Sequence, residues 1–236
     1  MASPNIQLPR SRSKRLVSVG SVGAQSLSLA LVGKQSPNRR AVELSIMQKF
    51  ERTYGAHLEH FLPDLIGLEI SGELGAVVGM RSARDNDLFL EQYLDQPVEQ
   101  AVAGAFMTPV DRDSIVEIGN LAANVPRLAY SLFAVLATVL SRAGYRWVAC
   151  TATPQVASML TRMNFSAAAI CRADESRLES GSVDWGTYYS SRPQVMAGDA
   201  NLAAEQVLSN PALAGLIRRY HQPITQMAAS LKSASK

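Results

Sequence analysis

The sequence predicts a single α/β domain in which helices flank a mixed sheet. Three observations indicate this class. The chain has 236 residues, which suits one well-buried core with irregular ends. Two apolar runs joined by a polar, glycine-bearing connection are typical of an antiparallel hairpin. Farther along, a succession of strand, helix, strand, helix and strand is typical of parallel strands joined by right-handed crossovers.

The first predicted elements are a helix and the hairpin. From Val42 to Leu58 an apolar residue recurs about every fourth position between polar ones, which marks an amphipathic helix. Pro63 ends any helix that reaches it. The hairpin strands are expected at 65–70 and 76–81. Two short helical pieces, at 88–94 and 98–108, then lead through a charged turn into the next strand.

The strand and helix succession starts near residue 114. Its expected members are strands at 114–121, 146–151 and 165–171, with helices at 126–142 and 154–163 between them. Pro126 suits a first helical turn and Gly144 suits a helix C-cap. The apolar part of the long helix, 128–140, is shorter than the roughly 17–25 residues that span a bilayer, so we expect a core helix. Less regular structure is expected afterwards, with a short helix at 200–208.

Basic residues are concentrated at the two ends of the chain. Residues 1–40 hold seven Lys and Arg and no acid, and residues 211–236 hold four and no acid. The body, 41–210, holds 12 basic and 20 acidic residues, a net charge of −8. We therefore divide the chain into a flexible basic arm at 1–37, one domain at 38–208, and a peripheral C-terminal helix and tail at 209–236. Basic arms attract an acidic partner protein or an anionic membrane surface, or are simply solvated tails.

Two cysteines and the N-terminal segment bear on the compartment. Cys150 and Cys171 each end an apolar strand, where cysteine behaves as a small hydrophobe, and neither spacing indicates a metal site or a disulfide framework. The segment 16–33 follows basic residues as a secretory signal would, but serine, glycine and glutamine dilute it and no small-x-small cleavage site ends it. We expect a cytoplasmic protein, with secretion as the alternative, and no nucleic-acid partner.

Several short strings resemble the thermostable hemolysin family over about residues 38–208. They are Phe61-Leu-Pro-Asp-Leu65, Gly79-Met-Arg81, Leu88-Phe-Leu-Glu-Gln-Tyr-Leu94, Val116-Glu-Ile-Gly-Asn-Leu-Ala122, Thr151-Ala-Thr153 and Trp185-Gly-Thr-Tyr-Tyr189. The order of elements is also similar to that of GNAT acyltransferases and acyl-homoserine-lactone synthases. The resemblance implies a GNAT-like mixed sheet flanked by helices, and transfer of an acyl group from a thioester to a small amine.

Glu117 is the predicted catalytic residue. Strand alternation places it on the face opposite Val116 and Ile118, and a carboxylate there must be paired, solvated in a cleft or protonated. In one interpretation its pKa is raised, and it accepts a proton from the attacking amine. In the other it forms an ion pair with Arg81 or Arg112. Both interpretations remain open from the sequence.

The resemblance implies that the strand after Glu117 binds the pantetheine arm of the acyl donor through its backbone. The donor contacts implied are Gly119, Asn120, Leu121, Ala122 and Arg127. The loop 122–127 has no glycine, whereas typical GNAT enzymes cradle the coenzyme A pyrophosphate there in a glycine-rich loop. Arg127 can meet a phosphate, and an acyl carrier protein suits the basic arms better than coenzyme A. No tightly bound cofactor is expected, only this thioester co-substrate.

Acceptor contacts are predicted at Arg81, Glu91, Trp185 and Tyr188. Arg81 can grip a carboxylate with its two-pronged geometry and Glu91 can hold an amine, while the aromatic pair walls an acyl pocket. A structural Arg81–Glu91 or Arg81–Glu117 pair and a plain aromatic core are the alternatives. For the whole protein, the alternatives to acyl transfer are a membrane-active hemolysin without catalysis and a catalytically inactive GNAT-like binding module.

Overall fold

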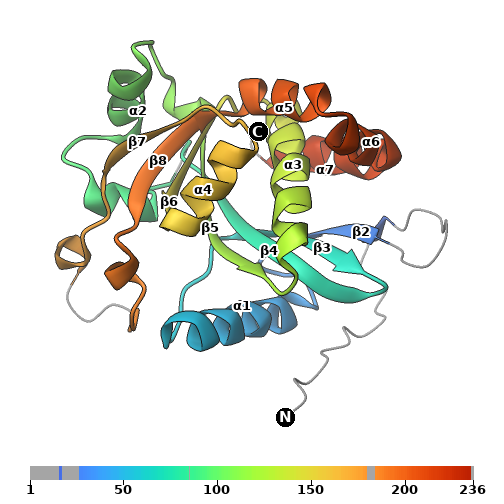
Figure 1. Cartoon of the computed structure of the whole chain (residues 1–236), viewed down its shortest axis with the longest axis horizontal. Helices are drawn as coiled ribbons and strands as arrows, with labels where there is room; N and C mark the ends of the chain where they lie inside the picture. Colours follow the sequence, from blue (N-terminus) through green and yellow to red (C-terminus); the bar gives the residue numbers. More distant parts are fainter. Residues whose placement is uncertain (1–15, 18–26, 85, 180–183, 235–236) are drawn as a thin grey trace.

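The computed structural model describes residues 16–17, 27–84, 86–179 and 184–234, in which helices cover both faces of an eight-stranded sheet (Figure 1). The strands are β1 (Leu16–Val17), β2 (Leu27–Val32), β3 (Asp64–Ile70), β4 (Glu73–Ser82), β5 (Ile115–Ala123), β6 (Trp147–Ala152), β7 (Ala167–Arg172) and β8 (Gln194–Asp199). The α-helices are α1 (Arg39–Tyr54), α2 (Val98–Phe106), α3 (Pro126–Ala143), α4 (Pro154–Arg162), α5 (Ala200–Ser209), α6 (Pro211–Arg219) and α7 (His221–Ala234). A short 3₁₀ helix, η1 (Phe89–Tyr93), precedes α2.

The sheet is mixed, with strand order β1-β2-β3-β4-β5-β6-β8-β7. Neighbours from β1 to β5 are antiparallel, which confirms the hairpin as β3 and β4, and β5 with β6 is the parallel pair. One expectation was wrong: β7 does not follow β6 in the sheet. Strand β8 lies between them, antiparallel to both. Strand β8 is short, and contacts distant in sequence set its neighbours in the sheet. The periodicity of the sequence does not indicate such contacts.

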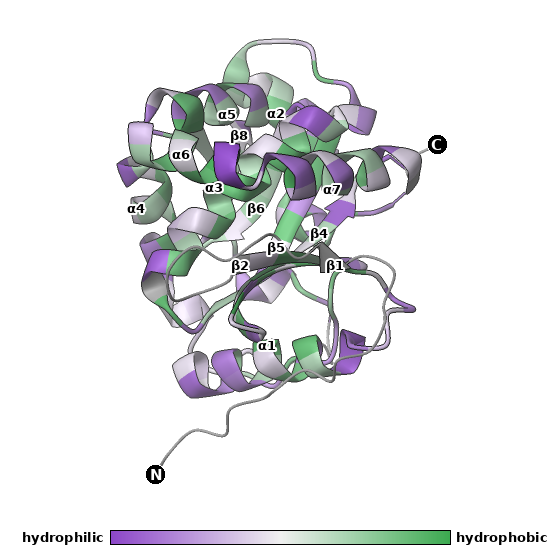
Figure 2. Ribbon diagram, turned by 90° about the vertical axis from the view of Figure 1, so that its right-hand side faces the viewer, coloured by the Kyte–Doolittle hydropathy of each residue, from purple (hydrophilic) through white to green (hydrophobic). Residues whose placement is uncertain are grey.

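Two apolar cores lie on opposite faces of the sheet. On one face, α3, α5, α6 and α7 pack around Leu132, Leu140 and Ile224, all fully buried. On the other, α1 and α2 pack through Ile46 and Val102. Figure 2 shows α1 on one side of the strands with α3 and α7 on the opposite side. The faces alternate along β5, since Val116 and Ile118 belong to the first core and Ile115 to the second.

Elements at both ends of the described chain pack onto the domain. Strand β2 pairs with β3 and buries Leu29 and Val32, so the sheet begins before residue 38; residues 1–15 and 18–26 of the predicted arm lie outside the described part. At the other end, α6 and α7 bury Ile217 and Leu231 in the α3 core. They do so because α3 is apolar around most of its circumference, and a helix of that kind must be covered on its outer side too.

The position of α3 accords with the expected core helix. In the ranges that the structure describes, no helix combines the length and apolar character needed to cross a membrane.

Replacing Ile224 by Ala tests whether α7 is part of this core. Ile224 is 0% exposed, so Ile224→Ala is expected to lower the free energy of unfolding by about 2–5 kcal/mol. Leu208→Ala is the control, because Leu208 is 54% exposed and its truncation should change stability by no more than about 0.5 kcal/mol. Urea unfolding measures both variants. Equal, small effects would show that α7 is peripheral.

Candidate active site between strands β5 and β6

The parallel strands β5 and β6 separate before either of them ends. Their paired residues run from Ile115 with Trp147 to Ile118 with Cys150, although β5 continues to Ala123 and β6 to Ala152. Beyond Ile118, β5 stays paired with β4, and β6 stays paired with β8. The β6-facing edge of residues 119–123 is therefore outside the β5–β6 ladder, which leaves an opening in the sheet.

A β-bulge at Asn120 accompanies this separation. Gly119 lies opposite Gly79 and Ala122 opposite Val77, so β5 carries one residue more than β4 over this stretch. Asn120 adopts a left-handed backbone conformation, with φ of 50°, and its Oδ1 accepts a hydrogen bond from the Leu62 N–H at 2.8 Å. A bulge bends its strand and increases the local twist.

Glycine at position 79 permits the close packing that the bulge requires. A Cβ atom built at Gly79 would lie 2.9 Å from Leu62 Cβ, closer than side chains tolerate, and 3.0 Å from Asn120 Oδ1, which is a tight contact. The absence of a side chain on β4 therefore lets the segment before β3 approach the bulge and donate its N–H to Asn120.

Glu117 is buried beside this opening and is held by backbone amides. Its side chain is on the α1 face, where Oε2 accepts from the Phe89 N–H at 3.0 Å and Oε1 from the Leu90 N–H at 2.9 Å. Burial raises the pKa of Glu117 to about 6, although the two N–H groups and the nearby Arg81 charge act to lower it. Among the described residues Glu117 forms no ion pair, so the alternative interpretation, a pair with Arg81 or Arg112, is not what the structure has.

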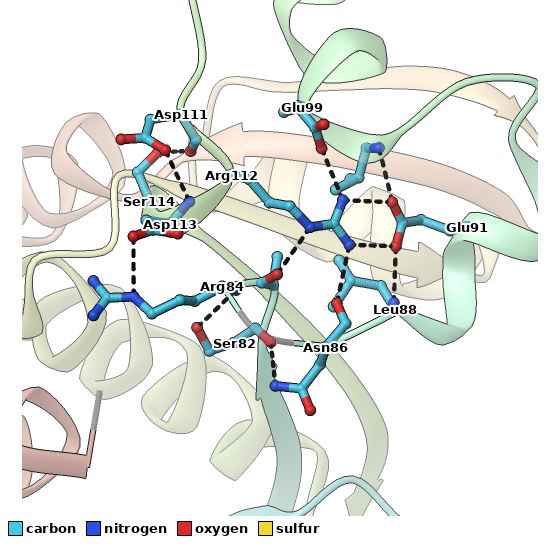
Figure 3. A network of polar contacts seen from close by, with 12 residues as sticks. Ser82, Arg84, Asn86, Leu88, Glu91, Glu99, Asp111, Arg112, Asp113 and Ser114 are labelled. Atoms are coloured by element: carbon cyan, nitrogen blue, oxygen red, sulfur yellow. Dashed lines mark hydrogen bonds and ion pairs between the residues drawn. The ribbon is translucent and has the colours of Figure 1, made fainter. Parts of the chain in front are cut away.

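Arg112 instead pairs with two other carboxylates, as Figure 3 shows. Its Nη1 lies 2.7 Å from Glu91 Oε1 and 2.8 Å from Glu99 Oε2. Glu91 also accepts from the N–H groups of Leu88, at 2.9 Å, and Val98, at 3.0 Å. Burial acts to raise the pKa of Glu91, but Arg112 and these amides outweigh it and hold the pKa at about 2. The network fixes the segment that presents its N–H groups to Glu117.

A cavity of about 460 Å³ passes from this carboxylate through the opening between the strands. It brings together seven predicted site residues, namely Arg81, Glu117, Gly119, Asn120, Leu121, Trp185 and Tyr188. On the α1 face Phe89 also lines it, and on the α3 face Phe133 and Val156 do so. Glu91, Ala122 and Arg127 are not among the lining residues. Glu91 belongs to η1 but its carboxylate contacts Arg112, Ala122 is buried in the α1 core, and Arg127 is exposed on α3.

The α1 side of the cavity is aromatic and carries polar groups. Tyr188 packs against Tyr54, with ring centroids 5.2 Å apart, and against Trp185, at 5.4 Å. The indole Nε1 of Trp185 is buried and has no hydrogen-bond partner among the described residues, so a ligand can accept from it. Arg81 donates to the Asp87 carbonyl at 3.0 Å and also faces the cavity.

Some lining residues carry no sequence signal for a site. Tyr54 belongs to the apolar stripe of a helix, and no motif surrounds His60. Thr153 and Gln155, at the start of α4, also line the cavity. They follow β6 directly, and the end of a parallel strand is the local signal that could have identified them.

A second, apolar cavity of about 60 Å³ adjoins the first. The two share Ile118, Phe133 and Cys150, and the second extends between the sheet and the helices α3 to α5. Burial raises the pKa of the Cys150 thiol to about 12, so it remains protonated and is a poor nucleophile. Cys150 therefore acts here as part of an apolar wall.

Comparison with known proteins supports both the family and the fold. A family model described as thermostable hemolysin matches residues 32–204. No curated protein matches the sequence.

Solved structures share the fold at low identity. FeeM, an N-acyl amino acid synthase from uncultured soil microbes, is 17% identical over 77% of this chain and 95% of its own, with a TM-score of 0.53. TofI, in a ternary complex with an inhibitor and MTA, is 14% identical over 78% of this chain and 98% of its own, with a TM-score of 0.51. BjaI, a CoA-dependent acyl-homoserine lactone synthase with SAM and isopentyl-CoA, is 11% identical over 87% of this chain and 98% of its own, with a TM-score of 0.50. These likenesses confirm the predicted acyltransferase-like fold.

The raised pKa of Glu117 predicts a specific dependence of stability on pH. Its pKa is about 6 in the folded protein against an ordinary value of 4.5, so the folded state binds this proton more tightly. The stability it contributes is complete below about pH 4.5 and is lost as the pH rises through 6, by about 2 kcal/mol. Glu117→Gln cannot titrate, so its free energy of unfolding should lack this decline.

Urea unfolding at several pH values between 4.5 and 7 measures the difference. Glutamine places an amide donor against one of the two backbone N–H groups, which lowers the free energy of unfolding by a similar amount at every pH. The substitution therefore changes the height of the curve and removes the pH dependence that Glu117 causes. Glu59→Gln, an exposed carboxylate, is the control and should follow the wild-type curve. Parallel curves for wild type and Glu117→Gln would contradict the assigned pKa.

Proposed function

The chain belongs to the thermostable hemolysin family, and we propose that it transfers an acyl group from a thioester donor to a small amine. The observation that carries the proposal is the buried Glu117, beside an opening that joins the two faces of the sheet in one cavity. Proteins with the same fold include an N-acyl amino acid synthase and a CoA-dependent acyl-homoserine lactone synthase, both of which form an amide from an acyl group.

Glu117 acts as the general base in this reaction. An ammonium group must lose a proton before its nitrogen can attack, and a carboxylate with a pKa of about 6 is mostly ionised near neutral pH yet basic enough to accept one. The N–C bond then forms at the thioester carbonyl and the C–S bond breaks. The sulfur leaves as a thiolate and takes up the second proton that the nitrogen releases, which gives the amide and a free thiol. The Phe89 and Leu90 N–H groups orient the carboxylate and stabilise its negative charge while it is ionised.

The donor binds on the α3 side of the opening. The edge of residues 119–121 lies outside the β5–β6 ladder and can pair with the amides of a pantetheine arm. The acyl chain passes Phe133 and Cys150 into the apolar cavity, where burial of methylene groups stabilises it. Both coenzyme A and an acyl carrier protein carry this arm. A thioester donor and two free cysteines suit the cytoplasm, which we propose as the compartment.

The acceptor binds on the α1 side. Arg81 and the Trp185 N–H, which has no partner among the described residues, can both bond a carboxylate, and Glu117 lies in the same cavity for the amine. We therefore propose an α-amino acid or a similar amine bearing a carboxylate as the acceptor. Tyr188 and Phe89 form an apolar wall for its side chain. Glu91 is left out of the acceptor contacts because its oxygens are engaged by Arg112 and backbone amides.

The second candidate is hemolysis without catalysis, and the family description favours it. A directly lytic protein does not need a titrating carboxylate, so substitution of Glu117 separates the two candidates. The same substitution tests whether the domain is a catalytically inactive binding module.

Glu117→Gln is expected to lower kcat for acyl transfer by about 10²- to 10⁴-fold. In the wild type, kcat/KM should rise with pH through about 6 and then level off, because only the ionised carboxylate accepts a proton. Thiol release from acyl-CoA and acyl carrier protein, with mass spectrometry of the amide, measures both. Glu59→Gln is the control. An undiminished rate in Glu117→Gln, or lysis that persists in it, would refute catalysis by this residue.

Arg81→Gln is expected to raise KM for a carboxylate-bearing acceptor by about 10- to 100-fold with little change in kcat, since a hydrogen bond to a charged group contributes about 1.5–3 kcal/mol. The wild type should also prefer the amino acid over its carboxamide, and the variant should lose that preference. Arg52→Gln, an exposed arginine of α1, is the control. If the variant keeps the preference, Arg81 does not bind the carboxylate.

A further inference from the structure

A groove between α3 and α4 continues the active-site cavity to the surface. Its volume is about 510 Å³ and its walls include Tyr130 of α3 and Ser158 and Arg162 of α4. It shares Leu121, Gln155 and Val156 with the active-site cavity. A ligand whose thioester lies beside Glu117 can therefore extend along the groove into solvent.

The elements around this groove are free of negative charge. From Ile118 to Ala173 the sequence has no Asp or Glu and five arginines, although the body 41–210 is acidic overall. Two of the five are engaged away from the groove, since Arg142 donates to Thr225 and Arg146 pairs with Asp199. An anion entering the groove thus meets positive charge and no carboxylate on either helix.

Arg162 is the cation that lines the groove. Its Nη2 donates to Ser158 Oγ at 3.0 Å and its Nη1 to the Tyr130 hydroxyl at 3.4 Å. Both partners are neutral, and Arg162 forms no ion pair in the described ranges. The guanidinium is positioned across the groove and keeps its charge uncompensated, and its planar donors match two oxygens of a phosphate.

Arg127, the phosphate contact predicted from the sequence, has a different setting. It lies in the first turn of α3, is exposed, and does not line the groove or the cavity. The loop before it has no glycine, so its backbone is not suited to a close cradle for a pyrophosphate.

On this basis, and resting on the proposed acyl transfer, we propose that Arg162, with the Tyr130 hydroxyl, binds the phosphate of the donor's phosphopantetheine arm. The phosphate contact is thus on α4 and not in the loop before α3. The phosphate could belong to coenzyme A or to an acyl carrier protein, since both carry this group on the same arm.

The test compares binding of 4′-phosphopantetheine with that of pantetheine, which lacks only the phosphate, by calorimetry. The wild type should bind the phosphorylated arm about 10- to 100-fold more tightly. Arg162→Ala should remove this difference, and Arg162→Lys should keep part of it because the charge remains. Arg127→Ala is the matched control and should bind like the wild type. Arg162 is exposed, so its variants are expected to fold, and circular dichroism checks this.

Loss of the difference in Arg127→Ala but not in Arg162→Ala would overturn the proposal, as would a wild type that binds both arms equally. The readout needs no turnover, so it is separate from the proposed function. If phosphate binding depends on Arg162 but no acyl donor supports transfer, the site stands and the proposed reaction fails. Among active donors, a KM increase in Arg162→Ala for acyl-CoA, acyl carrier protein or both identifies the source.

Discussion

The candidate site depends on the early separation of β5 from β6. Strands that remained paired to their ends would close the sheet between the α1 and α3 faces. The separation coincides with the left-handed backbone of Asn120, which the Leu62 N–H anchors and which Gly79 leaves room for. A single bulge thus frees one strand edge and joins the spaces on both faces in one cavity. Both proposed substrates would meet there.

Two neighbouring glutamates show how environment assigns different roles to one side chain. Glu91 lies against Arg112 and two backbone N–H groups, which hold its pKa near 2, so it stays charged and acts as a fixed structural anion. Glu117 is more deeply buried and has no paired cation in the described part of the chain, so its pKa rises to about 6. The two are linked through η1, because Glu91 holds the start of the helix whose amides hold Glu117. Glu91 therefore positions Glu117 through η1.

The sequence predicted the features that depend on local pattern. Strand alternation placed Glu117 opposite Val116 and Ile118, and apolar periodicity located α1, the hairpin and α3 close to their observed bounds. Features set by distant contacts were missed. The insertion of β8 depends on pairing with β6 across more than 40 residues, and the partner of Glu91 proved to be Arg112 because the turn at 112–114 folds back onto η1. Neither contact leaves a local signature.

The charge distribution across the sheet fits the two substrates proposed for it. The helices α3 and α4 have arginines and no carboxylate, as a donor with a phosphate requires. On the α1 side Glu117 and Arg81 line the cavity without pairing with each other, so each can bind the opposite charge of an amine with its own carboxylate. Because the sheet separates these surfaces except at the opening, each substrate can be recognised by its charge on one side. Only the uncharged thioester carbonyl of the donor has to reach the α1 side. No substrate charge then has to be buried without a partner where the reacting atoms meet.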